Sequence, residues 1–129
     1  MARLIVLDAS VAIAALAARD AHHDAAVAAL GGASSDDLVL AATTRAEVLI
    51  GPARVGGTVL TSARDFVDGC ETVPVTIAIA DGAAALKARH TALSLPDAIA
   101  LVVAETIEAD EIWTFDRRWR DVHPRVVIP

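Results

Sequence analysis

The stretch Arg3-Leu4-Ile5-Val6-Leu7-Asp8-Ala9-Ser10 decides the fold, because four consecutive apolar residues lead directly into a carboxylate. A short continuous apolar run predicts a strand, here over 3–8, that is buried on both faces, as in a parallel sheet covered by helices. The run at 38–42 has the same character. Because ligands bind at the carboxyl ends of the strands in open α/β sheets, we expect Asp8 to lie in a ligand crevice.

The rest of the chain alternates between strand-like and helix-like segments. Apolar spacing and Gly or Pro punctuation predict further strands over 38–42, 72–75, 111–115 and 125–128, and helices over 10–18, 22–31, 44–55, 58–68, 78–92 and 97–108. Pro74 indicates that the strand 72–75 lies at a sheet edge. Gly51-Pro52 and Gly56-Gly57 are expected to bend or end the helix 44–55. We predict one domain over residues 1–129, a three-layer α/β/α sandwich with a mostly parallel central sheet.

The composition describes an apolar and acidic chain, with 55% hydrophobic residues and a net charge of −6 at pH 7. This charge argues against coating nucleic acid by general electrostatic attraction. The single cysteine, Cys70, excludes an intramolecular disulfide and a cysteine-based zinc site, and it favours a cytoplasmic location. No apolar run reaches roughly 18 residues, so we expect no membrane span, and the strand-like N-terminus is no signal peptide.

Four acidic residues stand where the predicted elements would bring them together: Asp8, Glu47, Asp97 and Asp116. The first and last end strands, and the middle two fall in the first turns of helices. Carboxylates are the ligands that Mg²⁺ and Mn²⁺ prefer, and such ions polarise a phosphoryl oxygen and lower the pKa of a bound water. The hydroxyls of Ser10 and Thr114 are close enough in sequence to orient a carboxylate or a water.

Each acid also has a purely structural interpretation. Asp8 could cap the helix 10–18, and the spacing from Thr44 to Glu47 matches a capping box. Asp97 suits the first turn of a helix because of the helix dipole, and Asp116 could start a turn. Taken singly, each acid is better explained in this way, whereas the four taken together favour a metal site.

The histidines and the remaining motifs support no other catalytic chemistry. His22 and His23 are predicted to face solvent at the start of a helix, His90 lies near a helix end, and His123 precedes a proline in a turn. None of them has the spacing of a zinc pair. The chain also lacks a serine nucleophile elbow, a GxGxxG motif and a P-loop.

Four motifs in this order resemble those of the PIN-domain ribonucleases. They are Val6-Leu-Asp8-Ala-Ser10-Val-Ala-Ile, Thr44-Arg-Ala-Glu47-Val-Leu-Ile-Gly51-Pro-Ala-Arg54, Leu95-Pro96-Asp97-Ala-Ile-Ala100 and Trp113-Thr114-Phe115-Asp116-Arg117. The resemblance covers essentially the whole chain and is greatest to the VapC toxins of bacterial toxin–antitoxin pairs. One departure is Phe115, at a position that is often polar in the family.

The resemblance implies a Mg²⁺- or Mn²⁺-dependent endoribonuclease that forms a homodimer and is inhibited by a VapB-type antitoxin. Carried over by position, the catalytic residues are Asp8, Glu47, Asp97 and Asp116, of which Asp8, Asp97 and Asp116 bind metal, with Ser10 and Thr114 as supporting polar residues. Attack by water predicts products with 5′-phosphate and 3′-hydroxyl ends. We expect three arginines to position the RNA backbone, with solvated surface as their alternative role: Arg54, Arg117 and Arg118.

Three alternative interpretations remain at this point. A PIN-like protein-interaction module would keep the fold without catalysis. A phosphoaspartate receiver domain needs an acidic pair after the first strand and a late lysine at a strand end, whereas Lys87 falls in a predicted helix. A haloacid-type phosphatase needs Asp-x-Asp, where this chain has Asp8-Ala-Ser10. Apolar surface on the helices 10–30 and 44–55 is expected to meet a dimer mate or an antitoxin helix.

Overall fold

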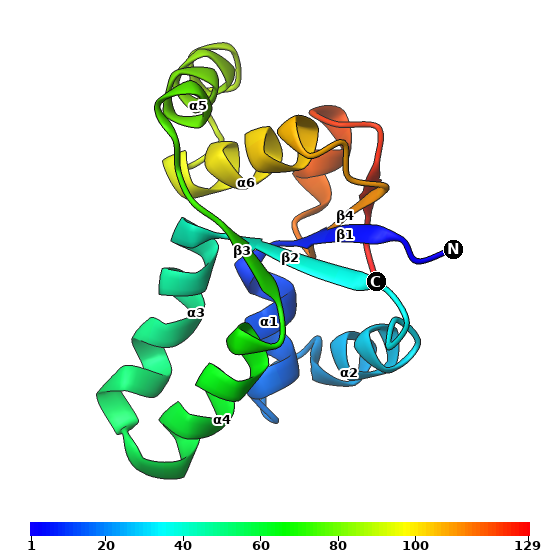
Figure 1. Ribbon diagram of the computed structural model, residues 1–129, viewed down its shortest axis with the longest axis vertical. Helices are drawn as coiled ribbons and strands as arrows, with labels where there is room; N and C mark the ends of the chain where they lie inside the picture. The colour runs from blue at the N-terminus through cyan, green and yellow to red at the C-terminus, as the bar shows by residue number, and fades with distance from the viewer.

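The computed structural model describes all residues 1–129 and contains one five-stranded sheet between two layers of helices (Figure 1). The strands are β1 (Leu4–Leu7), β2 (Asp37–Ala41), β3 (Glu71–Val73), β4 (Glu111–Trp113) and β5 (Val126–Val127). Their order is β3-β2-β1-β4-β5, and every neighbouring pair is parallel. The predicted strands are all present within a few residues at each end, and the edge position predicted for the third strand is correct.

Helices cover both faces of the sheet, which confirms the predicted three-layer sandwich. They are α1 (Ala9–Leu16), α2 (His23–Gly31), α3 (Ala42–Val55), α4 (Gly57–Asp68), α5 (Ile77–Arg89) and α6 (Leu95–Thr106), with a 3₁₀ helix, η1, over Arg117–Asp121. In Figure 1, α1 to α4 lie below the sheet, and α5 and α6 lie above it. The 3₁₀ helix was not predicted. None of the helices is long and apolar enough to cross a membrane.

The side chains of β1 divide between the two helical layers, which explains why its apolar run is continuous. Ile5 and Leu7 are fully buried in a cluster with residues of α1, α3 and α4. Val6, between them, is fully buried on the opposite face with residues of α6 and with Trp119 of the 3₁₀ helix. Because successive side chains of a strand point to opposite faces, both faces of a central strand must be apolar.

The helix α3 begins directly at the end of β2, earlier than predicted. Its N-cap is Ala41, which has no side chain to bond the helix N–H groups, and Thr44 is buried within the first turns. The capping-box interpretation of Thr44 and Glu47 is therefore wrong, because neither residue occupies the required position. Glu47 instead lies in the second turn of the helix.

The end of α3 is set by glycine. The helix runs through Pro52 to Val55, so Gly51-Pro52 does not end it. It ends at Gly56, whose φ of 74° and ψ of −164° are readily adopted only by glycine, and α4 begins at Gly57. This sharp connection returns the chain alongside α3, so that the two helices form an antiparallel pair (Figure 1).

Candidate active site

Two of the predicted site residues leave neighbouring strands at the same edge of the sheet. Asp8 directly follows β1, and Asp116 lies shortly after β4, which pairs with β1 in parallel. Their two chain segments are joined by a hydrogen bond from Thr114 Oγ1 to Asp8 Oδ2 of 2.7 Å. The strand-end argument thus locates both residues correctly.

The Asp8 carboxylate is buried and held by two hydroxyl groups. Its residue is 8% exposed, and Oδ2 accepts hydrogen bonds from Ser10 Oγ and Thr114 Oγ1, each of 2.7 Å. Although Asp8 occupies the N-cap position of α1, its side chain makes no capping bond, so the capping interpretation is wrong. The two hydroxyls also accept the backbone N–H groups of Phe115 (3.1 Å) and Asp116 (3.0 Å), and this network fixes the Asp8 carboxylate relative to β4.

Glu47 and Asp97 are half-buried and lie near the other acids. Burial raises the pKa of Glu47 above its ordinary value, and the charges of Asp8 and Asp97 raise it further. Burial likewise raises the pKa of Asp97, followed by the charge of Asp8. Neither carboxylate has an ion-pair partner. Both are therefore costly to ionise, unless a cation is supplied.

The helix α6 delivers Asp97 to this crevice by a regular N-terminus. Ser94 is the N-cap, and its hydroxyl accepts the N–H of Asp97 at 3.2 Å, while Pro96 occupies the first turn. The buried indole Nε1 of Trp119 has no hydrogen-bond partner of ordinary geometry, yet it lies close enough to Asp97 to lower the pKa of this carboxyl somewhat. No feature of the sequence predicts that Trp119 lies near Asp97.

Asp116 is paired with an arginine two residues along the chain. Arg118 donates from Nε to Oδ1 at 2.9 Å and from Nη2 to Oδ2 at 2.7 Å, and its backbone N–H also reaches Oδ1. Arg118 therefore lowers the pKa of Asp116. The predicted turn at Asp116 is correct, since Asp116 is the N-cap of the 3₁₀ helix. Both carboxylate oxygens are engaged, and a cation would compete with Arg118 for them.

The four acids are electrostatically coupled but do not form a finished coordination sphere. No three His, Cys, Asp or Glu side chains lie close enough to hold one metal ion. Repulsion between charges acts over longer distances than metal–ligand bonds do. The acids can therefore raise the pKa values of Glu47 and Asp97 without being close enough to bind one ion together. The donors are all carboxylate oxygens with two hydroxyls behind them, which is the chemistry that suits Mg²⁺ or Mn²⁺.

The arginines predicted to position RNA differ in their distance from the acids. Arg118 contacts Asp116, and the exposed Arg117 precedes it in the 3₁₀ helix. Arg54 is exposed at the end of α3, two turns beyond Glu47, or about 10 Å along the helix axis. A hollow of about 410 Å³ extends from Arg118 to Arg89 and His90. These last two residues were not among the predicted RNA-positioning residues.

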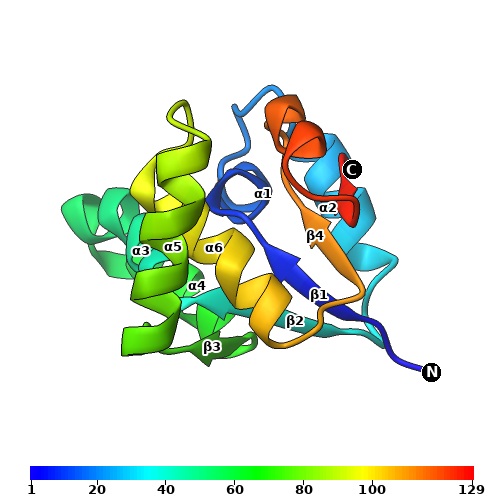
Figure 2. The same cartoon turned by 90° about the horizontal axis from the view of Figure 1, so that it is seen from above.

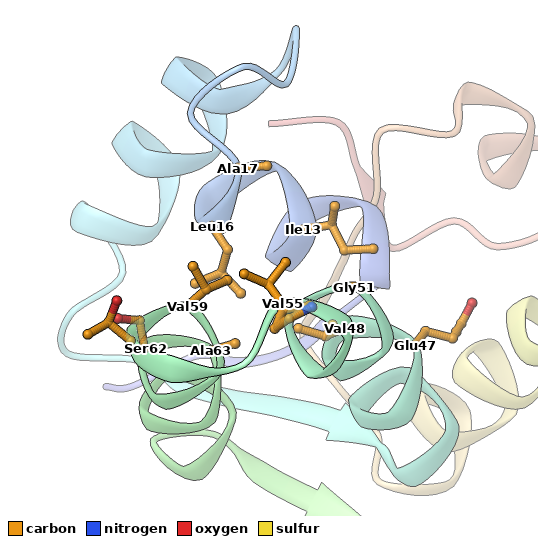
Figure 3. A pocket seen from close by; sticks show the side chains of 12 residues that line it. Ile13, Leu16, Ala17, Glu47, Val48, Gly51, Val55, Val59, Ser62 and Ala63 are labelled. Atoms are coloured by element: carbon orange, nitrogen blue, oxygen red, sulfur yellow. The ribbon is translucent and has the colours of Figure 1, made fainter.

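A larger apolar groove begins beside the acids. It has a volume of about 620 Å³ and lies between α1, α3 and α4. Ile13, Leu16, Val55 and Val59 line it, and Glu47 borders it, with its carboxylate pointing away from the apolar side chains (Figure 3). The groove includes surface of the helices 10–30 and 44–55, which were predicted to meet another protein, and of α4, which was not.

The prediction that His22 and His23 face solvent is correct for His22, which is exposed, and wrong for His23. The His22 ring stacks on Phe115, with 4.2 Å between ring centroids and an angle of 7° between planes. His23 is half-buried, and its Nδ1 lies 2.8 Å from the carbonyl oxygen of Ala14. Helical spacing cannot reveal such contacts, because they join residues of different elements: His22 contacts the segment after β4, and His23 contacts α1.

Comparisons with known proteins agree with this fold. The chain has 20% identity and a TM-score of 0.78 to VapC20 of Mycobacterium tuberculosis, a toxin that cleaves the sarcin–ricin loop, over 92% of this chain and 94% of the other. It has 23% identity and a TM-score of 0.80 to a chain of a toxin–antitoxin complex from Klebsiella pneumoniae, over 97% of each. For FitAcB of Neisseria gonorrhoeae the values are 20%, 0.69 and 88% of each chain.

The sequence comparisons identify the family. No curated protein matches the chain significantly in sequence. The family model of the PIN domain matches residues 5–123, which include all four acids and nearly the whole sheet. The chain belongs to the PIN-domain family.

Proposed function

We propose that this protein is a metal-dependent endoribonuclease of the VapC type, the toxin of a toxin–antitoxin pair. One observation carries the proposal: four carboxylates are electrostatically coupled at one edge of the sheet, and two of them, Glu47 and Asp97, have raised pKa values and no cationic partner. A binding module has no need of such mutual repulsion. A divalent cation would relieve it and supply phosphodiester chemistry.

The four acids have different surroundings, which suggests different roles. When bound, the cation would polarise a phosphoryl oxygen and lower the pKa of a water. Asp8, held by Ser10 and Thr114, is the rigid ligand of the set. Asp97 would be a second ligand, and Asp116 could be a third only if its ion pair with Arg118 opened. Glu47, with its raised pKa, is suited to take the proton from the attacking water.

The RNA backbone is proposed to follow the cationic side of the crevice. Arg118 lies between Asp116 and the hollow that contains Arg89 and His90, so a phosphate there would be adjacent to the acids. Arg117, at the start of the 3₁₀ helix, extends this charge. Arg54 is on the groove side and is proposed to contact RNA farther from the cleaved bond. Such contacts position RNA without reading its sequence.

The partners are proposed from exposed apolar surface. The groove between α1, α3 and α4 suits an apolar antitoxin segment, and the neighbouring Glu47 would favour a cationic residue at its end. A separate apolar surface lies at the start of α5 on the opposite helical layer, where Ile77 is 82% exposed. We propose this second surface for a homodimer. The chain is similar to proteins solved in toxin–antitoxin complexes, which supports a partner of this kind.

Product analysis of cleaved RNA tests the proposal. Purified protein should cleave RNA with Mg²⁺ or Mn²⁺ and stop when a chelator is added, leaving 5′-phosphate and 3′-hydroxyl ends. Asp8→Asn, purified in the same way, should be folded and inactive, which excludes a contaminating nuclease. Products with 2′,3′-cyclic phosphates would contradict water attack. Absence of both cleavage and metal binding by calorimetry would favour the interaction module instead.

A further inference from the structure

His22 and Phe115 form an aromatic stack at the rim of the carboxylate site. Their rings are parallel within 7° at a centroid distance of 4.2 Å. Phe115 is half-buried and packs against the core, whereas His22 is exposed. One face of the His22 ring lies on Phe115, so a ligand could stack only on the other face. The result is a flat aromatic surface that rests on a supported ring.

This surface is fixed relative to the proposed catalytic residues. Phe115 lies between Thr114 and Asp116, and its N–H donates to Ser10 Oγ, which in turn donates to Asp8. Phe115 and Asp116 are adjacent in the chain, with Cα atoms about 3.8 Å apart, so the stack stays close to Asp116. In Figure 2, the connection between α1 and α2, which carries His22, runs across the top of the view, and the stack shows that it reaches the segment between β4 and the 3₁₀ helix.

The loop that carries His22 is held at both ends. The backbone N–H of His22 donates to Asp20 Oδ1 at 2.8 Å, and the ring of His23 contacts the carbonyl of Ala14 at 2.8 Å. These contacts order a polar connection of the kind that is usually mobile. The His22 ring is thereby presented in a defined position before any ligand arrives, which reduces the entropy cost of binding to it.

An exposed aromatic stack is unusual in this chain. Aromatic residues make up only 3% of the sequence, tyrosine is absent, and Trp113 and Trp119 are buried. A flat ring beside a site for phosphodiester cleavage has the features of a seat for a nucleobase, since every base has a π-face that stacks on aromatic side chains. Packing alone would require Phe115 to be covered, but it would not require a second aromatic ring.

We propose that His22, supported by Phe115, is a stacking platform for one unpaired RNA base next to the cleaved phosphodiester. The proposal rests on the ribonuclease function and adds a substrate feature to it. A base in a continuous duplex is stacked on its neighbours and cannot reach the platform, so the preferred substrate is single-stranded RNA or a loop. Because base–aromatic stacking tolerates any base, loss of the platform should weaken binding about 10- to 100-fold without changing which sequence is cleaved.

The test is RNA binding measured by fluorescence anisotropy with Mg²⁺, in an Asp97→Asn background that prevents cleavage and leaves the Ser10–Phe115 contact intact. The probe is a labelled single-stranded RNA that the wild-type protein cleaves, together with a series in which each base is removed in turn. His22→Ala should lose the affinity stated above, and His22→Phe should retain it. One abasic position should weaken binding to the parent protein but not further weaken binding to His22→Ala.

The outcomes separate this proposal from the ribonuclease proposal. Equal RNA affinity for His22→Ala, His22→Phe and the parent, with equal melting temperatures, would overturn the platform. The platform would also be overturned if the affinity lost on removing each base simply added to the affinity lost in His22→Ala. If the wild-type protein cleaves RNA and His22→Ala does so at the same kcat/KM, the platform alone fails. If the coupling between His22 and one base is found without any cleavage, the ribonuclease proposal alone fails. No RNA binding at all would overturn both.

Discussion

Thr114 is expected to be the main support of the Asp8 carboxylate, and Thr114→Val tests this. The residue is fully buried, and its hydroxyl both donates to Asp8 Oδ2 at 2.7 Å and accepts the backbone N–H of Asp116 at 3.0 Å. Valine has nearly the same shape, so the substitution removes two hydrogen bonds and creates no cavity. The change thus isolates the polar contribution of one atom.

The expected cost follows from the two bonds that are lost. A hydrogen bond to a charged group contributes roughly 1.5–3 kcal/mol, and a buried N–H left without a partner costs a further amount of about 1 kcal/mol or more. Asp8 keeps its bond to Ser10, and relaxation of the loop would recover part of the loss. We expect the free energy of unfolding to fall by about 2–3 kcal/mol, which is a large share of the roughly 5–15 kcal/mol typical of such domains.

Urea unfolding of the metal-free protein at pH 7 measures this loss. With a slope of about 2 kcal/mol per molar urea, the midpoint should fall by roughly 1 M or somewhat more. Thr43→Val is the matched control, because the Thr43 hydroxyl is buried without any hydrogen-bond partner. That change should leave the midpoint unchanged or raise it. If both variants unfold at the same urea concentration, Thr114 does not stabilise Asp8 as inferred.

Three further changes test the charges and surfaces of the site. Glu47→Gln should raise the melting temperature of the metal-free protein at pH 7, because the raised folded-state pKa of Glu47 means that its charged form destabilises the fold. The protonated carboxyl favours folding below the ordinary pKa of 4.5, and this stabilisation is lost as the pH rises, so a gain from Gln that is independent of pH would contradict the argument. Arg118→Gln should strengthen Mn²⁺ binding in calorimetry, since it frees both oxygens of Asp116, and unchanged affinity would mean that Asp116 does not bind the ion directly. Val59→Asp, in the apolar groove, should abolish capture of a co-expressed antitoxin and leave RNA cleavage by the free protein intact; loss of both would indicate misfolding.

The sequence locates the strand-end acids because burial constrains both faces of a parallel strand. The run 4–7 must be apolar throughout, so the first carboxylate after it, Asp8, marks the point where the strand leaves the core. The same argument applies to the strand 111–113, which is followed, after two intervening residues, by Asp116. Helix propensity and Pro96 placed the start of α6 within two residues, and with it Asp97.

Side-chain partners were less predictable, because they depend on contacts between segments distant in sequence or on a choice between local bonds. The capping box at Thr44 failed because α3 follows β2 without a loop, and this removed the polar turn that a capping box requires. The ion pair between Arg118 and Asp116 competes with hydration of both side chains, so the sequence alone could not predict that it forms. The His22–Phe115 stack joins residues 93 positions apart, and no periodic pattern reports it.

The surroundings of the four acids also determine which of their negative charges are compensated within the protein. Asp8 is satisfied by two hydroxyl donors, and Asp116 is satisfied by Arg118, which leaves Glu47 and Asp97 as the acids without a cationic partner. A cation bound near Glu47 and Asp97 would offset the repulsion that these two acids leave uncompensated. Such a cation would attract Asp116 and weaken its ion pair with Arg118. The Arg118 side chain is 71% exposed even while paired with Asp116, and it borders the cationic hollow, where its guanidinium could bind a phosphate. The ion pair would thus keep Arg118, which is proposed to contact RNA, beside the acids until a cation binds.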